Sequence, residues 1–183
     1  RSRVQFAPRT IKLELFLITN IKSGGFVNGL SDSPSVEEIA RMMRSMSLHF
    51  NESVADANAT ARSVQSPTKR REYQDYAQTV SATNKLFHNI KDTFYDYMRV
   101  ESPTERLMLY ICSHGSTDLG IALTSGARGR NAIILDYMTV FPICIPQPAT
   151  ERQFPGVGTF LIQRILQEAV KDEQTQIITS PKW

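Results

Sequence analysis

The sequence predicts a mixed α/β (α+β) fold, with a central, mostly antiparallel sheet flanked by helices. Residues 10–18 alternate and are rich in β-branched side chains, which is typical of a strand. Residues 35–98 carry apolar side chains at helical spacing, and residues 106–179 contain three strand patterns, a helix and a short final strand. Residues 1–183 fit one domain, in which 35–98 is the helical segment and 106–179 is the core.

The helical segment begins with a capping box. The hydroxyl of Ser35 can accept a hydrogen bond from a first-turn amide, and Glu38 can reach back to the Ser35 amide. We expect this helix to end near Leu48. Residues 51–65 are small and polar with no apolar period, and they indicate a mobile loop or a poorly packed helical extension.

A second helix is expected from Ser66-Pro67, a pair suited to the N-cap and the first helical position. Its apolar and aromatic residues are spaced by three, four or seven up to about Met98, which indicates a packed face. Residues 81–84 form a weak centre at which this helix could break in two.

The second half of the chain alternates between strands and turns. Residues 106–113 and 119–124 predict a β-hairpin, and residues 132–140 predict a buried strand. A proline-rich loop leads into an amphipathic helix that ends near Lys171, and residues 175–179 predict the last strand.

Two glycines, Gly156 and Gly158, stand where the proline-rich loop becomes this helix. Bare backbone amides at the positive end of a helix dipole bind phosphate groups. A P-loop is excluded, because it needs Lys and then Ser or Thr after its last glycine. A dinucleotide fingerprint is excluded as well, because Leu161 stands where its third glycine would be.

The pattern Gln153-x-x-Gly156-x-Gly158, after an apolar strand and before an amphipathic helix, resembles the acyl-CoA-binding motif of the GNAT family of N-acetyltransferases. The resemblance spans most of the chain and is strongest over residues 106–179. It implies an acyl-CoA N-acyltransferase-like fold. It also implies transfer of an acetyl group from acetyl-CoA to a primary amine, by direct attack in a ternary complex.

The resemblance implies a role for particular residues. The pyrophosphate of coenzyme A would be held by the turn and the helix start, comprising Gln153 and Phe154 at the entrance and the amides of Gly156, Val157, Gly158 and Thr159. The pantetheine would be lined by the end of the preceding strand, comprising Met138, Thr139 and Val140. The amide of Val140 would polarise the thioester carbonyl.

The sequence departs from the family pattern in two places. The loop over residues 141–152 is longer and richer in proline than is usual for the family. The sequence also stops after its last strand, without the following elements that supply a tyrosine as general acid on the leaving thiolate. Tyr137 is the local substitute, although strand alternation predicts that it points away from the cofactor.

Attack by an amine requires a group that accepts its proton. Asp136, on the strand beside the expected thioester position, is the first choice, and its alternative role is to form a salt bridge or cap within the sheet. Glu151 and Asp118 are weaker choices in loops.

Two other function classes stay open. Cys144 and His114 suggest a Cys–His protease of the caspase type, although the residues around Cys144 lack the signature of that class. The second class is an acyl-CoA-binding or regulatory protein of the same fold without turnover.

Composition limits the partners. The formal net charge is +3, and Lys69-Arg70-Arg71 is the only tight basic cluster, so the sequence gives no clear nucleic-acid signal. The cysteines and histidines lack metal-ligand spacing, so no metal is expected. No apolar run approaches the ~20 residues of a membrane span.

The resemblance implies an amine acceptor, which the sequence leaves open between a protein lysine, a polypeptide N-terminus and a small molecule, and a homodimer stays open. Cys112 and Cys144 lie in apolar segments and indicate reduced, buried thiols, from which a cytoplasmic location is expected. The sequence begins at Arg1, so a targeting segment could precede it.

Overall fold

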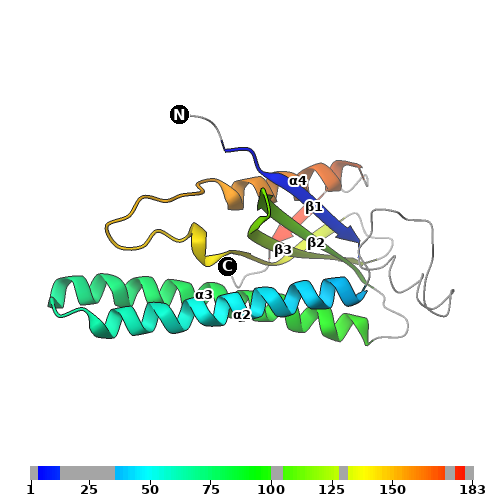
Figure 1. Cartoon of the computed structure of the whole chain (residues 1–183). Coiled ribbons are helices and arrows are strands. Elements are labelled where there is room, and N and C mark those ends of the chain that lie inside the picture. Colours follow the sequence, from blue (N-terminus) through cyan, green and yellow to red (C-terminus); the bar gives the residue numbers. More distant parts are fainter. Residues whose placement is uncertain (1–3, 13–35, 100–104, 128–131, 172–175, 180–183) are drawn as a thin grey trace.

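The computed structural model describes residues 4–12, 36–99, 105–127, 132–171 and 176–179. They form three layers, with a helical hairpin on one face of a sheet and a single helix on the other (Figure 1). The mixed α/β class is confirmed. The elements in chain order are β1 (Ala7–Lys12), α2 (Val36–Ser63), α3 (Pro67–Met98), β2 (Glu105–His114), β3 (Thr117–Ala127), β4 (Ala132–Val140), the 3₁₀ turn η1 (Pro142–Cys144), α4 (Val157–Lys171) and β5 (Gln176–Thr179).

The sheet follows the chain in its strand order, β1-β2-β3-β4-β5. Strands β1 to β4 pair antiparallel, whereas β5 lies parallel to β4. Strand β5 pairs only with the first part of β4, from Ala132 to Leu135. Within the described part of the chain, the rest of this edge of β4 has no strand partner.

The predicted strands are found with small shifts. Strand β4 has the predicted bounds, and β2 and β3 form the predicted hairpin around Gly115, whose φ is +59°. The first strand begins at Ala7 rather than at residue 10, because its backbone pairs with β2 from that point. The remainder of the predicted strand, residues 13–18, lies outside the described residues.

The first helix is longer than predicted. Helix α2 does not end near Leu48 but continues to Ser63, so the loop interpretation of residues 51–65 is wrong and the helical alternative holds. The reason is tertiary: the small side chain of Ala57 is buried against Ala77 of α3, which lets the two helices lie close together. Ser35, the start of the predicted capping box, lies outside the described residues.

Helix α3 has the predicted bounds and runs unbroken through residues 81–84. The tight turn between the helices is held by Arg70, whose Nε donates to the carbonyl of Val64 at 2.9 Å. The amide of Arg70 donates to the carbonyl of Ser66 at 2.8 Å. Arg70 of the basic cluster at 69–71 therefore caps the C-terminal end of α2, and its side chain is engaged within the chain.

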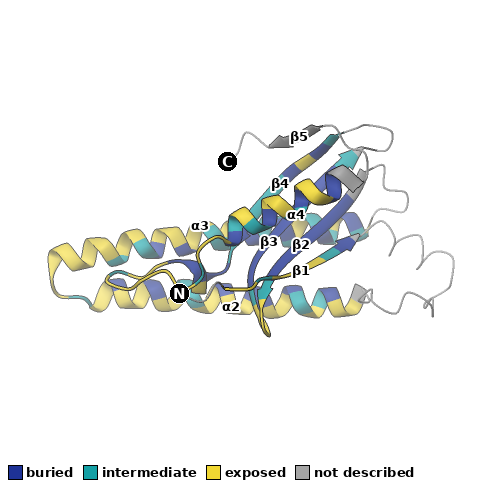
Figure 2. Ribbon diagram, turned by 90° about the horizontal axis from the view of Figure 1, so that it is seen from above, coloured by how far each residue is buried: buried dark blue, intermediate teal, exposed yellow. Residues whose placement is uncertain are grey.

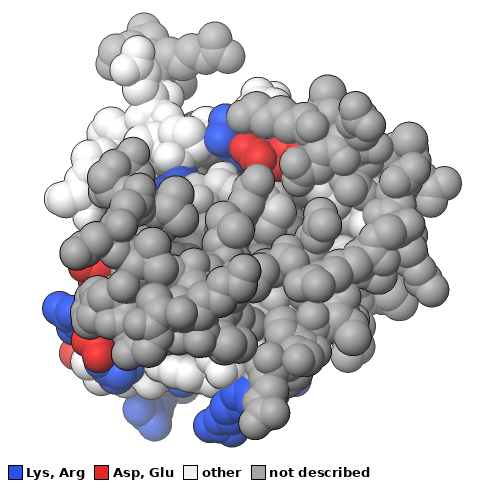
Figure 3. All heavy atoms as spheres, turned by 90° about the vertical axis from the view of Figure 1, so that its right-hand side faces the viewer, with Lys and Arg blue, Asp and Glu red and all other residues white. Residues whose placement is uncertain are grey.

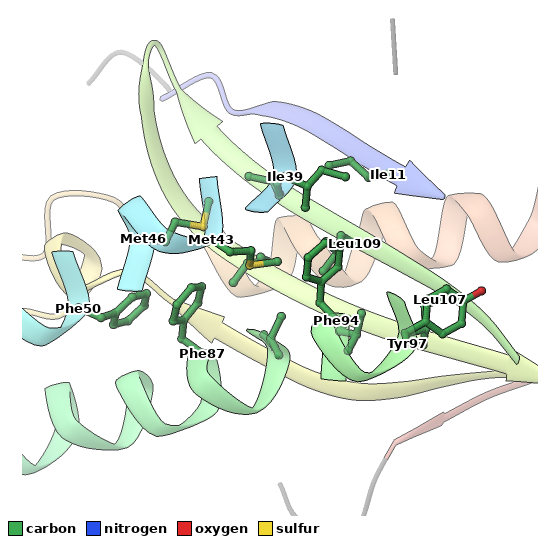
Figure 4. Close-up of a cluster of buried hydrophobic side chains, with 14 of the residues drawn as sticks. Ile11, Ile39, Met43, Met46, Phe50, Phe87, Phe94, Tyr97, Leu107 and Leu109 are labelled. Carbon is green, nitrogen blue, oxygen red and sulfur yellow. The ribbon is translucent and has the colours of Figure 1, made fainter. Parts of the chain in front are cut away.

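The core has a layer on each face of the sheet. The hairpin side holds a cluster in which side chains of α2 and α3 meet those of the strands, with Phe50 stacked on Phe87 at 4.8 Å and tilted against Phe141 at 4.9 Å (Figure 4). The other face packs against α4 through Val157, Leu161 and neighbouring residues. The far half of the hairpin extends past the sheet and is largely exposed (Figure 2).

Charged side chains of both signs lie on the described surface. On the face shown in Figure 3, basic and acidic side chains lie next to each other at the left edge and at the top. None of the described helices combines the length and the apolar character that a bilayer crossing demands.

Candidate functional site

The glycine turn becomes a helix where the sequence predicts it. The carbonyl of Gly156 accepts a hydrogen bond from the amide of Phe160 at 2.9 Å, which makes Gly156 the N-cap of α4. The next three amides, those of Val157, Gly158 and Thr159, therefore have no acceptor inside the helix. This is the arrangement that an anion requires.

The two glycines of the turn have different reasons to be glycine. Gly156 has a φ of +92°, which other residues rarely adopt. Gly158 is helical, and a Cβ there would meet only the methyl end of Met138 at 3.8 Å. Packing therefore leaves room for a side chain at Gly158, although glycine in a helix costs ~0.5–1 kcal/mol relative to alanine. The glycine at position 158 instead keeps the first turn of α4 free of a side chain that would obstruct its amides.

A third glycine places α4 against the sheet. A Cβ on Gly120 of β3 would lie 2.6 Å from Cγ1 of Val157 and 3.3 Å from the carbonyl oxygen of Thr139. The absence of this Cβ allows the first turn of α4 to lie directly on β3 and β4. Met138 and Val140 pack into the same cluster as Val157. The structure thus brings the expected pantetheine residues and the expected phosphate turn together.

Strand β4 contains a β-bulge at Asp136. Leu135 pairs with Thr124 and Tyr137 pairs with Leu123, so Asp136 is the extra residue. The bulge reverses the alternation of the strand: Leu135 and Met138 both pack toward α4, whereas Tyr137 packs toward the helical hairpin. Bulges are common beside active sites, where they redirect a strand and interrupt its pairing.

The predicted catalytic residues are not gathered at one point. At about 3.3 Å per residue, Asp136 lies roughly 13 Å along the strand from Val140. Tyr137 lies on the sheet face opposite α4 and therefore points away from Met138 and Val140, as predicted. Asp118, a weaker choice of base, accepts a hydrogen bond from Ser113 at 3.1 Å and lies 3.9 Å from Arg9.

The structure also places the remaining residues that the sequence predicts for the site. Thr139 is buried, and its hydroxyl donates to the backbone carbonyl of Thr83 at 3.1 Å, which ties β4 to the middle of α3. The ring of Phe154 lies 5.6 Å from the ring of His114, while Gln153 is exposed before the turn. Glu151 is exposed in the loop, whereas Asp118 lies in β3 and not in a loop as predicted.

A cleft of about 710 Å³ opens at the end of β4, between α3 and the proline-rich loop, which runs beside the hairpin in Figures 1 and 2. Val140, the expected thioester residue, is part of its lining. The α3 wall is polar and consists of Glu72, Asp75, Tyr76, Thr79 and Thr83. The loop wall consists of Cys144, Ile145, Pro146, Gln147, Pro148, Ala149 and Arg152.

The cleft residues on α3 were not predicted from the sequence. Positions 72, 75, 76, 79 and 83 follow helical spacing, so they share one face of α3. A polar stripe of this kind is normally assigned to solvent, and only the folded loop shows that it lines a cleft. Neither Glu72 nor Asp75 forms an ion pair with another residue in the described ranges.

Tyr76 has an environment unlike that of a surface tyrosine. Burial raises the pKa of its phenol above the ordinary value, and a hydrogen bond with the side chain of Gln147 offsets part of that rise. The phenol therefore stays protonated at neutral pH and can donate a hydrogen bond inside the cleft.

Cys144 and His114 do not form an activated pair. The thiol of Cys144 donates to the carbonyl of Leu119 at 3.3 Å, and burial raises its pKa to about 11. Nδ1 of His114 donates to the carbonyl of Gln5 at 3.1 Å. A nucleophilic cysteine needs a thiolate, so this geometry does not favour a protease. The described residues contain no group of three or more metal-ligating side chains.

Comparison with models of known protein families, with curated proteins and with solved structures gave no match.

Proposed function

We propose that the chain binds acetyl-CoA and transfers the acetyl group to a primary amine, as the resemblance to the GNAT family implies. One observation carries the proposal: the open amides of the glycine turn lie beside the second half of β4, whose edge away from β3 has no strand partner in the described residues. An anion site next to a free strand edge suits a ligand with a phosphate group at one end and an extended, amide-containing arm.

Different residues of the chain would bind the different parts of such a ligand. The amides of Val157, Gly158 and Thr159 would hold the pyrophosphate, and the edge of β4 from Met138 to Val140 would pair with the pantetheine arm. The amide of Val140 would then stabilise the negative charge that develops on the thioester oxygen when the amine attacks.

The geometry supports cofactor binding more directly than it supports proton transfer. Asp136 is the proposed base, and the ~13 Å along the strand means that it would act through ordered water if the thioester lies at Val140. Tyr137 faces the hairpin, so another donor would have to protonate the leaving thiolate. These two placements favour the second candidate function, an acyl-CoA-binding protein of the same fold without turnover.

Isothermal titration with acetyl-CoA tests the cofactor half of the proposal. In Gly158→Glu the new Cβ fits, and a carboxylate in the first turn favours the helix, so the variant should fold. The same carboxylate would repel the pyrophosphate, and we expect affinity to fall by ~10²-fold or more. Gly158→Ala adds only a methyl group where the family pattern accepts alanine, and Gln163→Glu adds the same charge to an exposed position further along α4.

Both control variants should keep an affinity within a few-fold of the unchanged chain. Equal binding in Gly158→Glu would remove the glycine turn from cofactor binding. Release of free coenzyme A in the presence of an amine panel then separates the two candidate functions, since a binding protein without turnover would release none.

A further inference from the structure

The end of β4 is held by strand pairing on one side only. Strand β5 reaches no further than Leu135, so the stretch from Asp136 to Val140 has β3 as its single strand partner in the described residues. The bulge at Asp136 interrupts this pairing, and a bulge adds bend and twist to the strand that carries it. Pairing alone therefore does not fix where the end of β4 lies.

The direction of the Val140 amide follows from the contacts of its neighbours. The amide of Phe141 donates to the carbonyl of Leu119 on β3 at 2.8 Å, and Phe141 is extended, with φ −73° and ψ 154°. Consecutive residues of an extended strand turn their main-chain groups to opposite edges, so Val140 and Gly120 face each other as a non-hydrogen-bonded pair. The amide of Val140 thus points to the edge away from β3, where the pantetheine arm would lie.

Thr139 ties this end of the strand to α3. The residue is 4% exposed, and its hydroxyl donates to the carbonyl of Thr83 at 3.1 Å. The hydroxyl oxygen also lies 3.4 Å from the carbonyl oxygen of Val140. Thr83 is in the middle of α3, where helical geometry already gives its carbonyl the amide of Phe87, so the hydroxyl uses the second lone pair.

The side chain of Thr139 controls the peptide group next to it. The Cα atom of Thr139 carries both the hydroxyl side chain and the peptide group whose N–H belongs to Val140. A side chain held on α3 therefore restricts the plane of that peptide. The restriction matters because a donor stabilises an oxyanion at about 2.7–3.1 Å, and a misplacement of about 1 Å lowers a rate by ~10²-fold.

We propose that Thr139 is a positioning residue, which holds the amide of Val140 at the thioester through its hydrogen bond to Thr83. The proposal rests on the proposed binding of acetyl-CoA. The main-chain groups of Thr139 point to β3, so the side chain is what this residue contributes to the site. A residue that only filled the core would serve as well if it were valine, which has a similar shape and no hydroxyl. Thr139→Val therefore separates the two roles.

An infrared signature of the bound cofactor tests the role without an acceptor. The probe is acetyl-CoA labelled with carbon-13 at the thioester carbonyl, whose stretching frequency falls when its oxygen accepts a hydrogen bond. We expect the band of the bound cofactor to move to higher frequency in Thr139→Val. The affinity for acetyl-CoA, measured by isothermal titration, should stay within a few-fold, since the amides proposed to hold the pyrophosphate are on α4.

Two further variants control this measurement. Thr139→Ser keeps the hydroxyl and should restore the parent band. Thr93→Val makes the same chemical change on α3, where the hydroxyl of Thr93 donates to the carbonyl of Asn89 at 2.8 Å, and it should leave the band where it is. A band that moves equally in Thr93→Val would overturn the role of Thr139.

Hydrogen exchange in the chain without cofactor gives a second readout. The amide of Phe141, bonded to Leu119, reports whether the end of β4 stays in place. We expect it to exchange ~10-fold faster in Thr139→Val and to recover in Thr139→Ser, while the amides of α3 keep their rates. An equal rise at all protected amides would mean a general loss of stability and would overturn the positioning role.

The two proposals fail in different ways. If acetyl-CoA does not bind, the transfer fails and the role at the thioester fails with it, and the exchange of Phe141 then decides whether Thr139 holds the end of β4. If acetyl-CoA binds and its band is the same in Thr139→Val as in the parent, the cofactor assignment stands and the positioning role falls.

Discussion

Asp136 is the residue that the bulge sets apart from the pairing of β4 with β3. If it accepts the proton of the attacking amine, Asp136→Asn should lower kcat/KM by ~10² to 10⁴ and remove the limb of the pH–rate profile that reports the base. The affinity for acetyl-CoA should not change, because the amide has the same size. A variant with the parent pH–rate profile would take Asp136 out of the mechanism.

Asp118→Asn tests the weaker choice of base. Asp118 is held by Ser113 and lies near Arg9, and it is at the far end of the β2–β3 hairpin from the bulge. We expect its loss to change kcat/KM by less than a few-fold, with any effect appearing as reduced stability of the order of 1 kcal/mol. A loss in this variant as large as in Asp136→Asn would reverse the assignment of the base.

The two buried thiols predict a pH dependence. Burial raises the pKa of Cys112 to about 12 and that of Cys144 to about 11, from an ordinary value of 9.0. The folded state therefore keeps these protons when the unfolded chain has lost them. Their contribution to the free energy of unfolding is fully present below pH 9 and is lost as the pH rises toward 11 and 12.

Alkylation by iodoacetamide at pH 8 measures the same property. We expect the native chain to react ~10²-fold more slowly than the chain unfolded in urea, since both the thiolate fraction and the access are reduced. Cys144→Ala should also flatten the fall of the unfolding free energy between pH 9 and 11. Fast native alkylation of Cys144 would mean an activated thiol and would restore the protease interpretation.

At the scale of elements, the contact between α4 and the sheet depends on Gly120. Gly120→Ala would place a methyl group 2.6 Å from Cγ1 of Val157 and 3.3 Å from the carbonyl oxygen of Thr139, so Val157 and the first turn of α4 that carries it have to shift. We expect a loss of ~1–3 kcal/mol in the free energy of unfolding and weaker binding of acetyl-CoA, because the helix start is displaced from β4. Urea unfolding and titration measure the two effects.

The double variant Gly120→Ala/Val157→Ala isolates the cause. It removes the Cγ1 atom that the new methyl group would meet, so acetyl-CoA affinity should recover relative to Gly120→Ala even though the cavity cost of Val157→Ala remains. An additive loss in the double variant would mean that the contact between these two side chains is not what positions α4.

Local sequence patterns were sufficient to predict the bounds of some helices and strands but not of others. The bounds of β4 and the start of α4 follow from an apolar run and a glycine turn, both of which are visible within about ten residues of sequence. The extension of α2 is not visible locally, because Ala57 is stabilised by Ala77 of the other helix. Small residues carry no amphipathic signal of their own.

In the candidate site, too, some features could be predicted from the sequence and others could not. The glycine turn could be predicted from the sequence because its function depends on consecutive backbone amides. The bulge at Asp136 depends on the register between two strands, and the cleft depends on a loop that folds back beside α3. Neither is encoded in a short stretch, and so the sequence predicted Asp136 and Val140 as neighbours in the mechanism although the strand separates them.

At the scale of the whole molecule, the hairpin and the sheet share one core. Phe87 of α3 is fully buried, stacks on Phe50 of α2 and lies 6.5 Å from Phe141, which follows β4 (Figure 4). The same cluster contains residues of β1, β2 and β3. A hairpin joined in this way cannot detach without exposing the apolar face of the sheet.

Phe87→Ala should therefore destabilise the entire fold rather than the hairpin alone. We expect the free energy of unfolding to fall by ~3–5 kcal/mol, with far-ultraviolet and near-ultraviolet circular dichroism still changing in one coincident transition. Leu48→Ala is the control, since Leu48 is 64% exposed on the same hairpin and should cost less than ~0.5 kcal/mol. Two separate transitions would show that the hairpin folds independently, and the cleft between α3 and the loop would then be a contact between two units rather than a fixed wall of the site.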